Sequence, residues 1–369
     1  MGHVTFKAKN VTMIAKHPML SARAKGRLQI LAGTLVSLAF LWLAFRGIDW
    51  RGTWETMIHA NAWLLLAALG SVLLATAIRA ERWRLMFFPN HRRLRRRKFL
   101  SIFLIGQVIN AATPARLGEL ARAYLIGEIE HVSKAQAFWT TVVEKMLDAL
   151  TLLLFLAGIS ASVALPGWLR DAGWTLSLAI VVVLLMLALA AVLQAKVARW
   201  IERLNARWAW SSRLRLGRFL TVVVESLQLM RRPRLSAGLM GWSALAFLVS
   251  SVTNWITGLA FGLHLPFTAY LLLLAVLQIS AVVPLPTSPG RVGLFHYLCV
   301  ISLAIFGVER DLALSYSLVL HVLTYLPMVV GGPLCLWLEN YSWGGLSRLL
   351  REDRGISIAP MRDSSLRSE

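Results

Sequence analysis

One polar stretch between long apolar segments constrains the fold more than any other part of the chain. Residues 106–122 read GQVINAATPARLGELAR, with Pro114 in the middle. Proline removes a backbone donor and disfavours helix at the residue before it, so a helix that reaches this stretch should break near Thr113. Non-helical backbone survives at membrane depth only where protein buries it or where it lines a watery cavity. We therefore expect the tip of a re-entrant helical hairpin that faces a cavity.

A second stretch repeats this pattern in the other half of the chain. The residues from Ser288 read SPGRVG, against TPARLG from Thr113, which aligns hydroxyl, proline, small residue, arginine, branched residue and glycine. Paired Pro/Gly-interrupted segments in the two halves of a transporter point to its binding site. The repeat predicts structural hinges at the prolines and glycines of both tips, which are Pro114, Gly118, Pro289, Gly290 and Gly293.

The composition is typical of a polytopic membrane protein, because 57% of the 369 residues are hydrophobic and 15% are charged. The formal net charge of +21 comes from basic residues that gather in the loops between apolar spans, so we expect no nucleic-acid partner. Cys299 and Cys335 lie in apolar segments and are not spaced for metal. A Walker loop, a nucleophile elbow and a metalloprotease motif are missing from the sequence, so we expect neither an enzyme nor a bound metal or cofactor.

The pattern of spans predicts an all-α integral membrane protein with about six full transmembrane helices plus two opposed re-entrant helical hairpins in an inverted repeat. A basic cytoplasmic N-terminus covers residues 1–27, the polytopic domain covers residues 28–338, and a basic cytoplasmic tail covers residues 339–369. Within the domain, the first repeat covers residues 62–159, an interfacial cytoplasmic segment covers residues 195–235, and the second repeat covers residues 237–338. Because basic residues mark cytoplasmic loops, both termini are expected in the cytoplasm of a bacterial inner membrane. Two full crossings by the second hairpin would fit the charge bias equally well.

Ionisable residues near the two tips are candidates for substrate binding. Arg116 and Arg291 follow the prolines, where half-helix N-termini present free N–H groups, and a guanidinium matches a phosphate bidentately. Glu144 and Asp148 share a helix face at a depth where a charge costs about 2.5–3.5 kcal/mol. These acids either neutralise a hairpin arginine, carry a proton during transport, or only orient helices. The other candidates are Asn110, Thr113, Glu119, Arg122 and Ser288.

Three features near these candidates have more than one interpretation. Residues 79–84, RAERWR, end the second span and are interpreted as interfacial anchors, with guidance of a headgroup as the alternative. The basic residues between 92 and 98 are expected to determine topology and to attract anionic lipid. Asn110 and Gln107 either satisfy the broken backbone, which we favour, or contact the ligand.

The order of four motifs resembles the flippase-like family. The motifs are RAERWRL at residues 79–85, N-x-x-x-P-x-R-x-G-E-x-x-R at 110–122, E-x-x-x-D at 144–148 and P-x-P-x-x-P-G-x-x-G at 284–293. The family includes the transmembrane flippase domain of lysylphosphatidylglycerol synthetases of the multiple peptide resistance factor type, and the resemblance covers about residues 28–338. It implies movement of a lipid with a charged or glycosylated headgroup between leaflets. Arg291 and His296 stand where the family often has a glycine and an acid. The soluble synthetase domain is not part of the resemblance.

Together these observations predict a secondary translocase, not driven by ATP, that moves a phosphate-bearing lipid or lipid-linked headgroup between the leaflets of the inner membrane. Its expected partner is an anionic or phosphate-bearing membrane lipid. The alternative is a non-transporting accessory subunit of a membrane lipid-modifying enzyme or glycosyltransferase.

Overall fold

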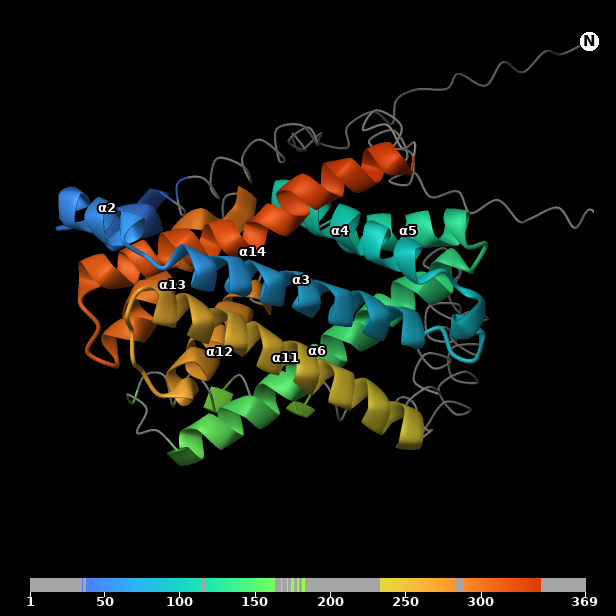
Figure 1. The fold of residues 1–369 in the computed structure, drawn as a ribbon. Coiled ribbons are helices and arrows are strands. Elements are labelled where there is room, and N and C mark those ends of the chain that lie inside the picture. The colour runs from blue at the N-terminus through green and yellow to red at the C-terminus, as the bar shows by residue number, and fades with distance from the viewer. Residues whose placement is uncertain are drawn as a thin grey trace, which may run out of the picture.

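The computed structural model describes residues 35, 38–113, 117–162, 233–282 and 289–339, with isolated positions between 167 and 182. Every regular element in these ranges is a helix (Figure 1). They are α2 (Trp50–Ile58), α3 (Ala62–Leu85), η1 (Asn90–Arg93), α4 (Arg96–Ala112), α5 (Gly118–Ile129), α6 (Lys134–Ser162), α11 (Pro233–Ala260), α12 (Phe267–Val282), η3 (Pro289–Arg291), α13 (Val292–Ala304) and α14 (Arg310–Leu338).

Three of these helices, α3, α11 and α14, are long and apolar enough to cross a membrane. An all-α membrane protein was predicted, and the described part of the chain agrees with that class. The predicted interfacial segment 195–235 and both predicted terminal segments, 1–27 and 339–369, lie almost wholly outside the described residues.

Helix α3 forms the centre of the bundle and packs most extensively against α11 (Figure 1). It begins where Asn61 Oδ1 accepts hydrogen bonds from the N–H groups of Trp63 and Leu64, which satisfies two free donors of the first turn. Small hydroxyl residues let the two helices approach, and Ser71 and Thr253 share a hydrogen bond of 2.6 Å across the interface.

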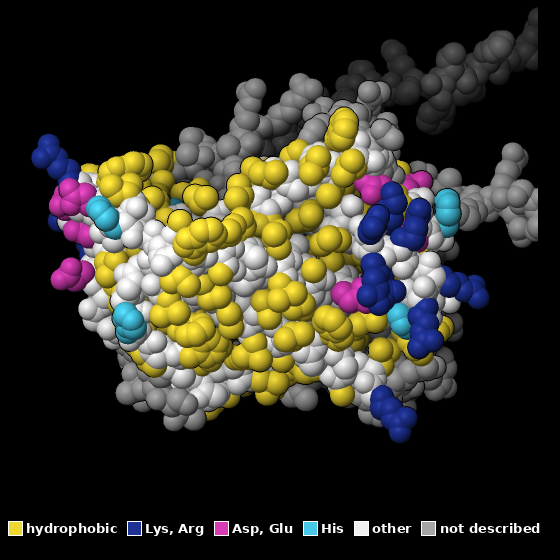
Figure 2. Space-filling view, in the orientation of Figure 1, with side chains coloured by type: hydrophobic (Ala, Val, Ile, Leu, Met, Phe, Trp, Pro, Cys, Tyr) yellow, Lys and Arg dark blue, Asp and Glu magenta, His cyan; other side chains and the backbone are white. Residues whose placement is uncertain are grey.

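Contacts between helix ends show that the start of α4 and the end of α5 lie at the same end of the molecule. Arg95, just before α4, pairs with Glu130, just after α5, at 2.8 Å. Lys98 in the first turn of α4 also pairs with Glu339 at the end of α14. Lysine and arginine side chains gather at this end (Figure 2). The two helices therefore form a short antiparallel pair that opens at the basic end.

The second short pair, α12 and α13, opens at the opposite end of the molecule. The N–H group of Asn61, before α3, donates to the carbonyl oxygen of Ala260 at the end of α11, which places those two helix ends together. Tyr270 near the start of α12 and Leu303 near the end of α13 share a buried cluster with Leu314 of the first turns of α14. The two pairs extend toward each other, and η3 at the tip of the second pair contacts α4 of the first.

The first pair breaks where the sequence predicts a break. Helix α4 ends at Ala112, and Thr113 has an extended backbone with φ −114° and ψ 129°. At the second tip, Gly290 has φ +72° and Arg291 has φ +52°, both in the left-handed region. Glycine adopts this region without steric cost, so Gly290 is the position that allows the chain to turn into α13.

Candidate functional site

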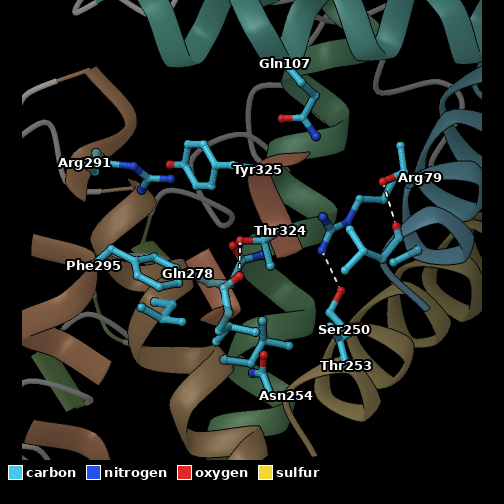
Figure 3. A pocket seen from close by; sticks show the side chains of 16 residues that line it. Arg79, Gln107, Ser250, Thr253, Asn254, Gln278, Arg291, Phe295, Thr324 and Tyr325 are labelled. Atoms are coloured by element: carbon cyan, nitrogen blue, oxygen red, sulfur yellow. Dashed lines mark hydrogen bonds between the residues drawn. The ribbon is translucent and has the colours of Figure 1, made fainter. Parts of the chain in front are cut away.

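A partly polar cavity of about 180 Å³ lies where the two short pairs meet the long helices (Figure 3). A volume of this size accommodates on the order of ten water molecules or a small headgroup. The lining residues of α3 and α14, Val72 to Arg79 and Leu320 to Tyr325, come from the middle portions of these helices. The cavity therefore lies within the bundle rather than at either end.

Two arginines from different elements point into this cavity from opposite sides (Figure 3). Arg79 comes from α3 and donates from Nη2 to the Ser250 hydroxyl at 2.9 Å. Arg291 comes from the tip of the second pair, and its buried Nη1 atom has no hydrogen-bond partner among the described residues. Neither arginine forms an ion pair with a described carboxylate. The cavity thus carries a positive charge that the described part of the protein does not neutralise by direct pairing.

The remaining polar lining is uncharged and comes from five helices, which are α3, α4, α11, α12 and α14. It can donate and accept hydrogen bonds, because it combines hydroxyl and amide side chains from Thr76, Gln107, Ser250, Thr253, Asn254, Gln278, Thr324 and Tyr325. The Tyr325 hydroxyl also donates to the carbonyl oxygen of Gly290 at 2.6 Å, which ties α14 to the second tip. This arrangement suits an anionic group that bears hydrogen-bonding substituents.

Next to the cavity, four charged side chains form a buried network. Arg82 lies one turn after Arg79 and donates to Asp148 at 2.6 Å and to Glu144 at 3.4 Å. Arg122 of α5 donates to the other oxygen of Glu144 at 2.8 Å. Arg82, Arg122 and Glu144 are all at most 4% exposed. With two cations and two anions the network is electrically balanced, so it has no surplus charge for a ligand.

Aromatic rings hold the Arg122 guanidinium in place within this network. Its carbon Cζ lies 4.2 Å from the ring centroid of Trp83 and 4.5 Å from that of Phe103. The Trp83 Nε1–H group donates to the Thr140 hydroxyl at 2.9 Å, which fixes the indole ring between α3 and α6. The network therefore attaches α5 to α3 and α6.

Close backbone contact brings α4 and α5 together beside the network. A Cβ atom on Gly118 would lie 2.0 Å from the carbonyl oxygen of Gly106. A Cβ atom on Gly106 would lie 2.4 Å from Cγ of Arg122. Both positions therefore need glycine for space, and Gly118 serves helix packing in addition to its place at the start of α5.

Of the nine residues predicted to bind substrate, Arg291 lines the cavity, whereas Arg116 and Ser288 lie outside the described residues. The predicted hinge Pro114 also lies outside them, Pro289 is described by its backbone within η3, and Gly293 is buried in α13. The other six predicted binding residues have partners within the protein and do not line the cavity. They are Asn110, Thr113, Glu119, Arg122, Glu144 and Asp148.

The partners of these six residues show what each one does locally. Asn110 Oδ1 accepts from the Gly118 N–H at 2.8 Å, so Asn110 satisfies the broken backbone, as we favoured, whereas Gln107 lines the cavity. The Thr113 hydroxyl donates to the Ile109 carbonyl at 2.7 Å. Glu119 pairs with Lys145 at 3.2 Å on a more exposed face. Glu144 and Asp148 pair with Arg122 and Arg82, rather than with Arg291.

The interpretation of residues 79–84 as interfacial anchors is wrong for Arg79 and Arg82, and also for Trp83, which is fully buried against Arg122. Arg82 is 1% exposed and belongs to the buried network, and Arg79 lines the cavity. The candidates predicted from the sequence did not include seven further polar lining residues, which are Thr76, Ser250, Thr253, Asn254, Gln278, Thr324 and Tyr325. Asn254 and Gln278 carried a usable signal, because each is an amide within an otherwise apolar segment.

Metal-ligating residues do not gather in the described part of the chain, where no group of three or more His, Cys, Asp or Glu side chains is close enough to hold an ion. His296 is buried, and its Nδ1 atom lies 3.0 Å from the Ser317 hydroxyl. Cys299 is buried, Cys335 is partly buried, and both are free thiols.

Comparison with known proteins places the chain among membrane proteins of the same general kind. It is 21% identical over 317 residues to UPF0104 membrane protein MJ1595 of Methanocaldococcus jannaschii, a match that covers 80% of this chain and 92% of that protein. It is 24% identical over 340 residues to Glycosyltransferase AglD of Haloferax volcanii, a match that covers 84% of this chain but 54% of that protein. The chain thus spans about half the length of the second relative. No solved structure matches the chain.

The model of one protein family covers most of the sequence. Its description is "Lysylphosphatidylglycerol synthase TM region", and it matches residues 30–332. That range includes the two short helix pairs, the cavity and the charged network. The family shown by this match is the one that the four sequence motifs resemble, and the chain is a multi-pass membrane protein that belongs to the lysylphosphatidylglycerol synthase transmembrane-region family.

Proposed function

We propose that the protein is a secondary translocase that moves a phosphate-bearing lipid between membrane leaflets without ATP, and that the cavity binds the headgroup phosphate. The single observation that carries the proposal is the pair of arginines, Arg79 and Arg291, which face one cavity without a described carboxylate partner. A charged side chain within a membrane span costs about 2.5–3.5 kcal/mol, so two arginines without a direct carboxylate partner among the described residues indicate an anionic ligand.

The local geometry at the second tip supports phosphate as the bound anion. Arg291 occupies the N-cap position of α13, and its side chain forms no capping hydrogen bond there. The N-terminus of a helix attracts anions because its first N–H groups are free and its dipole is positive. Guanidinium groups bind phosphate through paired hydrogen bonds. Arg79 lies on the cavity wall opposite Arg291, so both guanidinium groups could bind the same phosphate.

The arrangement of the short helix pairs supports a route for the headgroup. We infer that α4–α5 and α12–α13 are re-entrant hairpins that begin from opposite membrane surfaces, as in an inverted repeat. Helices α4 and α12 have 17 and 16 residues, and α5 and α13 have 12 and 13. At a rise of 1.5 Å per residue, these helices span about 18–26 Å, which is shorter than the hydrocarbon core of about 30 Å. Interrupted backbone at that depth is tolerated when it lines a polar cavity.

Reconstitution in proteoliposomes tests this proposal directly. A trace of short-chain fluorescent phosphatidylglycerol is placed in one leaflet, and a membrane-impermeant quencher reports the fraction that has moved. Arg79→Gln and Arg291→Gln each remove a charge-assisted hydrogen bond of about 1.5–3 kcal/mol, so each should weaken binding of the headgroup by about ten-fold or more. Arg51→Gln, at an exposed position of α2, serves as the matched control.

The result that would overturn the proposal is unchanged lipid movement in the double variant Arg79→Gln/Arg291→Gln. Wild-type protein that binds no phosphatidylglycerol and moves none would overturn it as well.

A second candidate function is that of a non-transporting accessory subunit of a lipid-modifying enzyme or glycosyltransferase. The observation that favours it is the relative named Glycosyltransferase AglD, of which this chain spans about half. Stoichiometric copurification of such an enzyme, together with a purified chain that moves no lipid, would support this function over translocation.

A further inference from the structure

We infer that His321, directly behind the cavity wall, is a proton-binding site coupled to anion binding at the two arginines. The inference rests on the proposed function, because it assigns a proton partner to the same anion site. It would make the protein a proton-coupled translocase.

The position of His321 on α14 links it to the cavity. Its ring stacks on that of Tyr325, with centroids 4.1 Å apart, and meets Phe295 edge-on at 4.7 Å. Tyr325 and Phe295 both line the cavity, and Tyr325 also bonds to the carbonyl oxygen of Gly290, next to Arg291. A single layer of side chains thus separates the imidazole from the anion site.

The hydrogen bonding of His321 leaves an atom available for a proton. Its Nδ1 atom is buried and has no partner among the described residues. A second imidazole, that of His296 on α13, lies with its centroid 5.0 Å away. The Nδ1 atom of His296 lies 3.0 Å from the Ser317 hydroxyl, which itself donates to the Leu314 carbonyl, so His296 Nδ1–H donates to that hydroxyl. In the tautomer of His321 with its hydrogen on Nε2, the unpartnered Nδ1 presents a lone pair. A proton from water would form an N–H bond at that lone pair and leave the ring with one positive charge.

The charges around His321 make its protonation depend on the ligand. Helix α13 contributes His296, η3 contributes Arg291, α14 itself contributes Tyr325, and α3 contributes Arg79 across the cavity. The cavity-lining side chains of α4, α11 and α12 are uncharged. With the cavity empty, Arg291 repels a proton on His321, and no described carboxylate pairs with Arg291 or Arg79. A bound phosphodiester neutralises one of these positive charges, which favours protonation.

Coupling of this kind is reciprocal. If the anion favours protonation of His321, a proton on His321 increases the affinity for the anion by the same factor. The combination of one proton and one singly charged headgroup carries no net charge, so its transfer avoids the cost of about 2.3 kcal/mol for one charge against 100 mV. A transmembrane proton gradient would then bias the direction in which the lipid moves.

Calorimetric titration of the purified full chain in detergent micelles tests the coupling. The probe is dihexanoyl phosphatidylglycerol, whose phosphodiester does not titrate over the range of about pH 5 to 8 in which histidine does. Titrations in two buffers with different ionisation enthalpies give the number of protons taken up on binding. We expect up to one proton per probe and an affinity that rises by as much as about ten-fold for each unit of decrease in pH.

Variants separate the proton site from the anion site. His321→Asn should abolish proton uptake and flatten the pH dependence while binding persists, and His321→Gln provides a second variant if the first does not fold. The matched control is His264→Asn, at an exposed position outside the cavity, which should retain proton uptake.

Two results would overturn the inference. If the wild type binds the probe without proton uptake, or if His321→Asn keeps the uptake, the proton site is refuted while the anion site stands. If the wild type does not bind the probe at all, both the anion site of the proposed function and the proton site are refuted.

Discussion

Replacement of Glu144 by glutamine provides the sharpest test of the buried charge network. Glu144 is 3% exposed and accepts from Arg122 at 2.8 Å and from Arg82 at 3.4 Å. At an effective dielectric constant of about 20, Coulomb's law gives about 6 kcal/mol for the closer contact and about 5 kcal/mol for the other. Desolvation offsets much of this attraction, and removal of one partner of a buried pair costs about 3–5 kcal/mol. We therefore expect Glu144→Gln to lower the free energy of unfolding by about 3–5 kcal/mol.

The measurement is equilibrium unfolding in mixed micelles, in which the fraction folded is followed as the share of denaturing detergent rises. Glu119→Gln is the matched control, because Glu119 pairs with a lysine whose side chain is 59% exposed. Exposed pairs contribute about 0–1 kcal/mol, so the control should lose little stability. Similar losses of less than about 1 kcal/mol in both variants would refute the claim that the buried network holds α5 against α3 and α6.

Three further substitutions test separate contacts by the same unfolding measurement. Gly118→Ala places a methyl group 2.0 Å from the carbonyl oxygen of Gly106, so it should cost about 1–3 kcal/mol or more. Trp83→Phe removes the hydrogen bond to Thr140 and leaves a gap at a fully buried position, so it should cost about 1–3 kcal/mol. Gly290→Ala forces an L side chain into φ +72° and should cost about 1–2 kcal/mol, whereas Gly290→Asn should cost less.

Controls and contrary outcomes differ among these three. Gly70→Ala, in the same bundle but with open space around its Cβ position, should be neutral or stabilising by up to about 1 kcal/mol. If Gly118→Ala behaves like Gly70→Ala, then α4 and α5 do not approach as closely as described. If Gly290→Asn is no better than Gly290→Ala, backbone strain is not what limits that position. A stable Trp83→Phe variant would show that the indole N–H contributes nothing to the free energy of unfolding.

The sequence predicts the helical class and the break near Thr113 because both depend on local chemistry. Apolar length indicates membrane helices, and the X-Pro rule locates the residue at which α4 ends. The match between residues 113–118 and 288–293 also indicates the second tip, where Arg291 lines the cavity.

The partners of the charged residues could not be predicted in the same way. Arg79 and Arg82 lie three residues apart at the end of one span, and nothing in their spacing says that one faces a cavity and the other a pair of acids. That difference depends on how α3 packs against α6 and α11. The pattern of residues along α3 alone does not predict this packing. Likewise, Thr324 and Tyr325 join the site because α14 passes beside the second tip.

The balance of charge in the buried network bears on how related sequences can vary. A change that removes Arg122 alone leaves one excess negative charge on the pair Glu144 and Asp148, so it should survive only when position 144 also becomes neutral. The side chain of Asp148 is 31% exposed, so water can replace part of its hydrogen bonding. Substitutions at position 148 should therefore be tolerated more readily. Across related chains, substitutions that remove the charge at position 122 should therefore occur together with substitutions that remove the charge at position 144.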